Sequence, residues 1–247
     1  MKRSALLFHE LRQQILSPAL LAVGALFLLL QGCLFLLVLQ FFHREAQFVR
    51  PICLWMKTFW MGTLLLVPPL TMRTVAEERL LGTLDTLLTA SLGPAAIVCC
   101  KFFSCWLHVL LLWVLALLLP ALAQRGLYLP FPFATGAELL QNIAFLALVQ
   151  ALHVAVGILW STVAGQPIVA GTGTFLSLLC LLFAPRALAQ ATSLGEWTGL
   201  QHFLARQEVF TVLSEFQWGI FDGRTLLCYG GLTGLLLCCA TFLLRRP

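Results

Sequence analysis

The chain has 247 residues, of which 60% are hydrophobic and only 10% are charged, and its mean hydropathy is +0.95. Soluble globular domains carry about one quarter charged residues, so this composition excludes a soluble domain and predicts a protein embedded in a lipid bilayer. The net charge of +5 is modest and dispersed along the chain, which indicates membrane orientation and argues against a nucleic-acid partner.

The N-terminal stretch "SALLFHELRQQILS" predicts an amphipathic helix that lies at the membrane interface. Leu7, Leu11 and Ile15 repeat every four residues, and the opposite side is polar and includes Arg12 and Gln14. The apolar run that follows is too long for a signal peptide and lacks a cleavage site, so we expect it to remain as the first membrane span.

A bilayer core of about 30 Å needs about 20 apolar residues for each helical crossing, and the chain holds six such runs. The predicted fold is therefore all-α: one polytopic transmembrane domain over residues 1–247. Pro68 and Pro69 are expected to kink the second helix, and Pro94 to open the third. The predicted spans are 18–42, 52–75, 95–123, 137–160, 168–184 and 225–244.

Six crossings place both termini on the same side of the membrane. If that side is the cytoplasm, basic residues are more numerous inside than outside, which favours this topology. The segment 72–94 is then cytoplasmic, and the long polar stretch 185–224 is outside. Within that stretch, Leu200, Phe203, Leu204 and Phe210 predict an amphipathic helix on the outer leaflet, either as an outer gate or as a passive element.

The stretch "MRTVAEERLLGTLDTLLTASLGP" gathers charges between two apolar runs. Its acidic and basic residues are expected to end the second helix in water, a glycine to break it, and a threonine to cap a short helix, 84–89, whose leucines share one side. An ordinary solvated loop is the alternative, but two charged blocks around a Gly-Thr break favour a docking element for a protein partner. The residues predicted to dock are Glu77, Glu78, Arg79, Gly82, Thr83, Leu84, Asp85, Leu87 and Leu88.

The string "AEERLLGTLDTLLTASLGPAAIVCCKF" resembles the cytoplasmic signature of type-2 ABC transporter permeases, in which Glu-Glu-Arg is followed by Gly-Thr-Leu, an acidic residue, leucines and a Lys next to an aromatic. Two further stretches, "HELRQQILSPALLAVGALFLLLQGCLF" and "HFLARQEVFTVLSEFQWGIFDGRTLLCY", are similar to the gliding-motility-associated branch of this family. One departure is that "AAIVCC" precedes Lys101, where the family often has a charged residue, which puts docking contacts on that side in doubt.

The resemblance implies a permease subunit that lies in the bacterial inner (cytoplasmic) membrane with both termini cytoplasmic and moves a substrate outward. It implies pairing with a second permease chain, as a homodimer or a heterodimer, and docking of the 84–89 helix in a cleft of an ABC ATPase subunit. The chain has no GxxxxGK[ST] phosphate loop, so we expect ATP and magnesium to bind that partner and this chain to be no enzyme and to hold no cofactor or metal.

Two other functions stay open at this stage. One is a membrane anchor of an ABC-type mechanical, motility or surface-assembly complex that transports no solute. The other is an intramembrane enzyme, although the chain has no HExxH, no GxSxG and no paired intramembrane Asp residues. The substrate and the direction of transport are not encoded in any motif.

Four polar residues of the third and fourth spans are candidates for a transport pathway, because polar groups are costly in lipid and mark function. They are His108, Asn142, Gln150 and His153. Hydrogen bonds between helices, each contributing about 1 kcal/mol, are the alternative explanation.

Small residues predict close helix packing at two places. Gly171, Gly173 and Ser177 would let another helix approach the fifth span. Gly230 and Gly234 form a GxxxG motif in the last span, whose partner the sequence does not identify.

Overall fold

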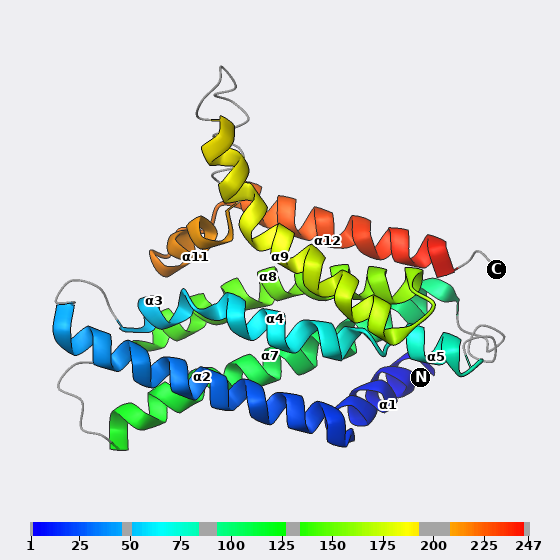
Figure 1. Ribbon diagram of the computed structural model, residues 1–247, viewed down its shortest axis with the longest axis horizontal. Coiled ribbons are helices and arrows are strands. Elements are labelled where there is room, and N and C mark those ends of the chain that lie inside the picture. The colour runs from blue at the N-terminus through cyan, green and yellow to red at the C-terminus, as the bar shows by residue number, and fades with distance from the viewer. Residues whose placement is uncertain (1, 46–50, 84–92, 127–133, 193–207, 245–247) are drawn as a thin grey trace.

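The protein was analysed as a computed structural model that describes residues 2–45, 51–83, 93–126, 134–192 and 208–244. Every regular element in these ranges is an α-helix (Figure 1). The helices are α1 Lys2–Leu16, α2 Pro18–Glu45, α3 Pro51–Met56, α4 Phe59–Thr71, α5 Ala76–Leu80, α7 Pro94–Gly126, α8 Gly136–Val163, α9 Pro167–Thr192, α11 Val209–Gln217 and α12 Gly223–Leu244.

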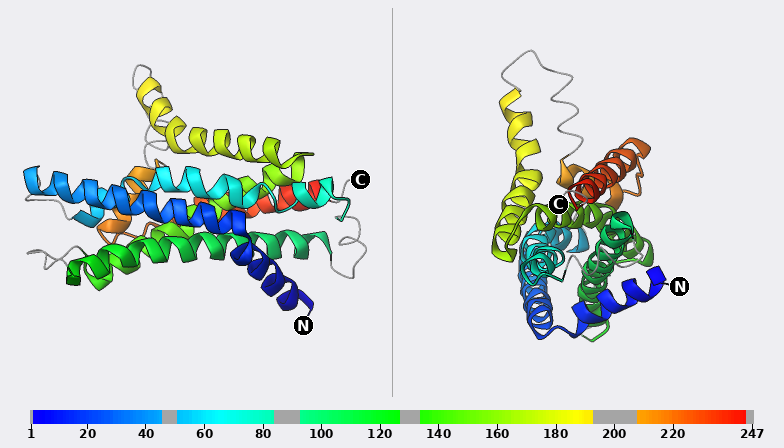
Figure 2. Two further views of the ribbon diagram at one scale, coloured as in Figure 1. Left: turned by 60° about the horizontal axis from the view of Figure 1, so that its bottom comes forward. Right: turned by 90° about the vertical axis from the view of Figure 1, so that its right-hand side faces the viewer.

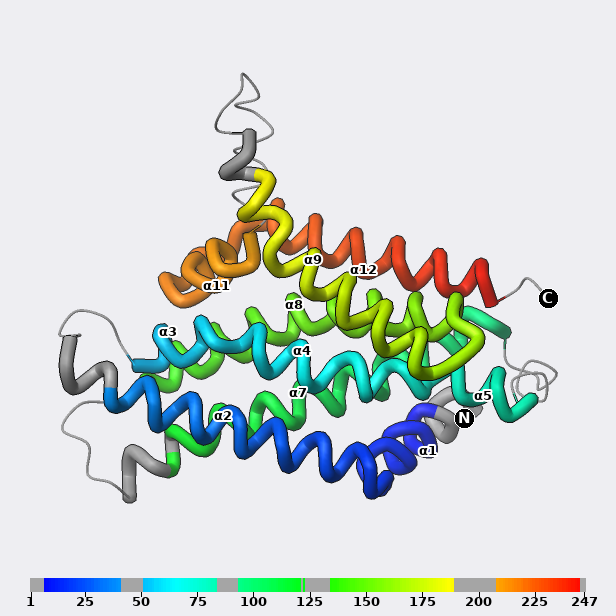
Figure 3. The backbone as a smooth tube through the Cα atoms, viewed as in Figure 1, coloured from blue at the N-terminus to red at the C-terminus, as the bar shows by residue number. Residues whose placement is uncertain are grey.

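The long helices run along the long axis of an elongated bundle, with α8 between α7, α9 and α12 (Figures 1 and 2). The tube in Figure 3 shows that α1, α5 and the last turn of α12 lie at the same end of the bundle. The N-terminal helix, the charged segment and the end of the C-terminal helix thus share one end of the bundle.

Five helices are long and apolar enough to cross a bilayer, and the chain is a multi-pass helical membrane protein. Their many exposed leucines, such as Leu29 of α2 and Leu227 of α12, are typical of surfaces that face lipid. The five segments are Pro18–Gln40, Pro94–Pro120, Gly136–Val163, Pro167–Leu188 and Gly223–Leu244.

The predicted second span, 52–75, is not one continuous helix. It consists of α3 and α4, which are separated at exposed Lys57 and half-buried Thr58. The Thr58 hydroxyl donates to the Trp55 carbonyl at 2.7 Å. A threonine that bonds its own backbone competes with the helical ladder, and a lysine is costly inside an apolar helix, so the chain breaks there. Together α3 and α4 still run from one end of the bundle to the other (Figure 1).

The predicted fifth span ends too early at residue 184. Helix α9 continues through Pro185 to Thr192, and its apolar segment reaches Leu188. The sequence after Pro185 is rich in alanine and leucine, which favour helix strongly enough to carry the chain past one missing N–H donor.

The predicted outer-leaflet helix has a different location in the part that the structure describes. Leu200, Phe203 and Leu204 lie outside the described residues, whereas Phe210 belongs to α11 and packs edge-on against Phe59 of α4, with ring centroids 5.9 Å apart. The apolar face of α11 is buried against the bundle, mainly on α8, rather than spread on a lipid surface. An amphipathic pattern alone does not distinguish a lipid partner from a protein partner.

The small residues of α9 do allow a close approach, as predicted. A Cβ on Gly173 would stand 2.6 Å from the Trp160 ring of α8, and the Trp160 indole N–H donates to Ser177 Oγ at 2.7 Å. A Cβ on Gly171 would stand 3.1 Å from Sδ of Met72. In contrast, Gly230 and Gly234 of α12 have no atom within 4 Å of a built Cβ among the described residues, so this motif packs against nothing there.

Candidate functional site

The charged segment folds into the short helix α5, whose first turn is held by another helix. Val75 occupies the N-cap position and offers no side-chain acceptor. Instead, Ser161 Oγ on α8 accepts the backbone N–H groups of Val75 at 3.0 Å and Ala76 at 3.1 Å, and lies 3.2 Å from the Thr74 hydroxyl. Two of the backbone donors that a helix start leaves without an intrahelical partner are therefore satisfied by α8.

The other end of α5 is closed by the Gly-Thr pair. Gly82 has φ of +69°, a left-handed conformation that glycine adopts without steric cost, and the Thr83 N–H donates to the Glu78 carbonyl at 3.0 Å. Gly82 does follow the end of a helix, but it does not end the second span as predicted. The helix that ends here is α5 itself, since α4 has already ended at Thr71.

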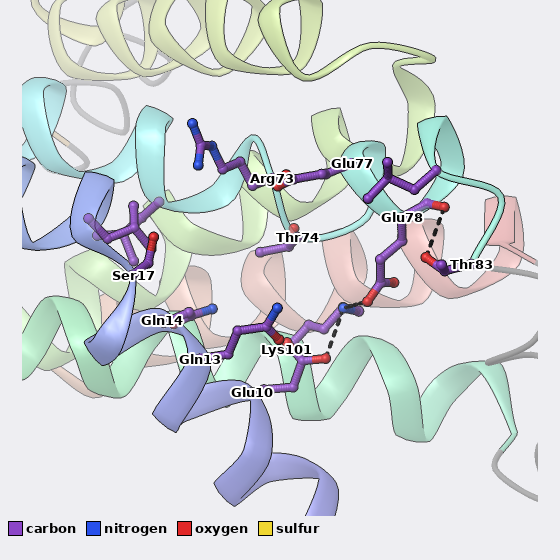
Figure 4. A pocket seen from close by; sticks show the side chains of 13 residues that line it. Glu10, Gln13, Gln14, Ser17, Arg73, Thr74, Glu77, Glu78, Thr83 and Lys101 are labelled. Carbon is purple, nitrogen blue, oxygen red and sulfur yellow. Dashed lines mark hydrogen bonds and ion pairs between the residues drawn. The ribbon is translucent and has the colours of Figure 1, made fainter.

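A buried ion-paired triad joins α5 to two other helices (Figure 4). The Lys101 ammonium of α7 lies 2.7 Å from Glu78 Oε1 of α5 and 3.0 Å from Glu10 Oε1 of α1. Lys101 is only 1% exposed and Glu10 is 9% exposed. Charges this deeply buried are stable only when paired, so the three helices are fastened to one another at this point.

Burial raises the pKa of the Glu78 carboxyl above its ordinary value. The Lys101 ammonium opposes this shift, and the carboxylates of Glu10 and Glu77 add to it. One ammonium is shared between two carboxylates, so the triad carries one negative charge more than it neutralises. Burial is the main reason that the protonated form of Glu78 is easier to reach than in water, and the two neighbouring carboxylates add to it.

The predicted polar side of the N-terminal helix is exposed at His9, Arg12 and Gln13, but the prediction is wrong for Gln14. Glu10 and Gln14, the latter on the side predicted to face water, are buried against α7, whereas Arg12 is exposed. The Gln14 amide donates to Cys105 Sγ of α7 at 3.1 Å. The polar contacts with Lys101 and Cys105 decide which side of α1 turns inward, because a buried lysine requires an anionic neighbour.

The residues predicted to dock are only partly gathered in this site. Glu78 is drawn into the triad instead of ending a helix in water; Glu77 and Arg79 are half-buried, and Gly82 and Thr83 are exposed. The predicted helix 84–89 lies outside the described residues, with Leu84, Asp85, Leu87 and Leu88.

The four pathway candidates are all buried, and two of them, Gln150 and Asn142, form hydrogen bonds within the helix bundle. Gln150 of α8 donates to Thr63 Oγ1 of α4 at 2.7 Å, and Asn142 donates to the Glu138 carbonyl of its own helix at 2.7 Å. Both ring nitrogens of His153, and Nδ1 of His108, lack a hydrogen-bond partner in the described parts of the chain. The side of α8 that carries Gln150 packs on α4, which favours the helix-packing explanation for that residue.

Of the residues that build the site, Glu78 was selected from the sequence, whereas Glu10, Lys101 and Ser161 were not. Lys101 is the sole lysine or arginine within Pro94–Pro120, and a lone charge in an apolar span signals a buried partner. That signal predicts an acidic neighbour but cannot choose among ten acidic residues. Nothing in the sequence predicted Ser161 as the cap of α5, because a single serine near a helix end forms no recognisable motif.

The chain was also compared with known proteins. It matches no family model, and no curated protein is found to be similar to it.

Proposed function

We propose that this protein is the membrane-spanning permease subunit of an ATP-driven ABC-type exporter. In this proposal a separate ATPase chain docks on the segment 72–94 and moves it. The resemblance of "AEERLLGTLDTLL" to the type-2 permease signature supplies the family. One structural observation supports the mechanism most strongly: the charged segment is fastened to the bundle by buried polar contacts.

A segment that transmits force must be tied to what it moves. Helix α5 is tied to α8 through Ser161, to α7 through Lys101, and to α1 through the shared contact of Lys101 with Glu10. A displacement of α5 therefore cannot leave these helices where they are without breaking buried polar contacts, each of which is costly to leave unpaired.

The proposed sequence of events uses only these ties. Closure of two ATPase subunits on ATP moves the segment beyond Gly82 in each of two paired permease chains. The movement passes through α5 to α7 and α8, whose long apolar segments change their tilt in the bilayer and open a path for the substrate. ATP is hydrolysed on the ATPase, and this chain transmits the movement through α5 to its membrane spans.

The first test is membrane topology. A membrane-impermeant thiol reagent should label Thr83→Cys only after cells are permeabilised, with the unsubstituted chain as the control for the nine native cysteines. Labelling of intact cells would place the segment outside and would overturn the proposal.

The second test is association with an ATPase. An ABC-type ATPase from a neighbouring gene should copurify with this chain and hydrolyse ATP only in its presence. Leu87→Asp should reduce copurification more than Glu77→Ala, because apolar insertion contributes more than a surface ion pair, which is worth about 0 to 1 kcal/mol. Equal effects of the two substitutions would count against docking by the leucines.

A further inference from the structure

A cavity of about 390 Å³ lies between α1, the α4–α5 segment and α7, beside the buried triad (Figure 4). This volume is within the range of about 300 to 1,000 Å³ that is typical of small-ligand sites. Its lining includes Glu10, Gln14, Glu77, Glu78 and Lys101. Ser17, at the junction just before the first apolar span, lines it as well.

The buried lining atoms that lack a hydrogen-bond partner in the described part of the chain are both acceptors. Oε2 of Glu78 and Oε1 of Gln14 are buried and have no partner in the described part of the chain. Gln14 is 8% exposed, and its amide nitrogen is already committed to Cys105. The groups that remain unsatisfied can only accept, so what is missing is a donor.

The triad also has an excess of negative charge, which favours a positively charged ligand. The Lys101 ammonium is shared by two carboxylates, and the half-buried carboxylate of Glu77 lines the same cavity. Arg73 also lines it, but Figure 4 shows its side chain pointing away from the triad. A bound cation with N–H donors would complete both the charge and the hydrogen bonds.

We propose that this cavity binds a primary ammonium group, and that its source is the ethanolamine headgroup of a membrane phospholipid. The cavity adjoins Ser17, one residue before the Pro18–Gln40 span, which is the depth at which headgroups lie. The Arg73 guanidinium, on the same cavity, offers a partner for the lipid phosphate. A choline headgroup has no N–H donor, and a glycerol headgroup has no positive charge, so neither meets both needs.

The test is a comparison of lipids that differ only in the headgroup. The purified chain is stripped of lipid and mixed with phosphatidylethanolamine, phosphatidylcholine or phosphatidylglycerol with identical acyl chains, and retained lipid is measured by native mass spectrometry. Phosphatidylethanolamine should be retained about tenfold more strongly than either of the others, the ratio expected for the loss of one good charged contact.

Two variants and one matched control tie the preference to the cavity. Glu78→Gln and Gln14→Leu should each reduce the preference for phosphatidylethanolamine at least severalfold. Glu215→Gln changes the charge by the same amount in α11, away from this cavity, and should leave the preference intact. Thermal unfolding of each variant shows whether it is folded. If Glu78→Gln does not fold, Gln14→Leu alone tests the proposal.

The outcomes separate the possible ligands. Equal retention of all three lipids, or a preference for phosphatidylglycerol, would overturn the proposal. A preference that survives both Glu78→Gln and Gln14→Leu would also overturn it, since the lipid would then bind elsewhere. Stabilisation by free ethanolamine at millimolar concentration, without retention of its lipid, would keep the ammonium site but assign it to a soluble amine. No ATPase is needed, so failure here leaves the permease proposal untouched.

Discussion

Ser161 on α8 caps a helix to which it does not belong: its Oγ accepts the N–H of Ala76, the first residue of α5, at 3.1 Å. The same oxygen accepts the N–H of Val75 at 3.0 Å. Residues from distant parts of the chain thus share one cap, and the position of α5 depends on α8.

Replacing Ser161 by alanine should destabilise the protein by about 1 to 2 kcal/mol, because two buried backbone donors lose their acceptor. Thermal unfolding in detergent measures the loss. Thr172→Ala is the matched control, since the Thr172 hydroxyl is exposed and bonds only carbonyls of its own helix. If the two variants melt alike, the cap contributes nothing to stability.

Replacing Lys101 by methionine should cost about 3 to 5 kcal/mol, because the buried carboxylate of Glu10 and the half-buried carboxylate of Glu78 would remain with no counter-charge. The triple variant Lys101→Met, Glu10→Gln, Glu78→Gln removes all three charges and should recover most of that loss. Unfolding midpoints of the single and triple variants make the comparison. A triple variant no more stable than the single one would show that charge burial is not the cause.

The effect of pH on stability follows from the raised pKa of Glu78. The folded state binds this proton more tightly than the unfolded state does, so the stabilising contribution is complete below the unfolded pKa of about 4.3 and is lost as pH rises through the higher folded pKa. In delipidated protein, Glu78→Gln should therefore melt no lower than the parent at neutral pH, and the difference between them should shrink toward pH 4. A parent that gains on the variant as pH rises would contradict this sign.

Replacing Gly157 by alanine should cost about 1 to 3 kcal/mol through overpacking. The added Cβ would lie 2.7 Å from Cβ of Thr71 on α4, an atom too close to the backbone to move aside. Gly230→Ala on α12 is the control, because no other described element comes within 4 Å of a Cβ there and alanine favours helix by up to about 1 kcal/mol. Equal destabilisation by both would mean that helix spacing near Gly157 adapts freely.

Much of the helical framework follows from the sequence alone. Long apolar runs predict the membrane spans because a bilayer sets their minimum length, and Pro94 and Gly82 mark a helix start and a helix end because their backbone preferences are local. The small residues Gly173 and Ser177 likewise predicted a close neighbour, and the structure places Trp160 there. Each of these features depends on residues near one another in the chain.

Only the tertiary structure decided the rest. The inward face of α11 depends on what packs against it, because an apolar helix face suits a lipid partner and a protein partner alike. The triad joins residues 10, 78 and 101, and the cap joins 76 and 161, so no local pattern specifies them. A lone charge in an apolar span states that a partner must exist, because burial without one is too costly, but the fold alone determines which residue that partner is.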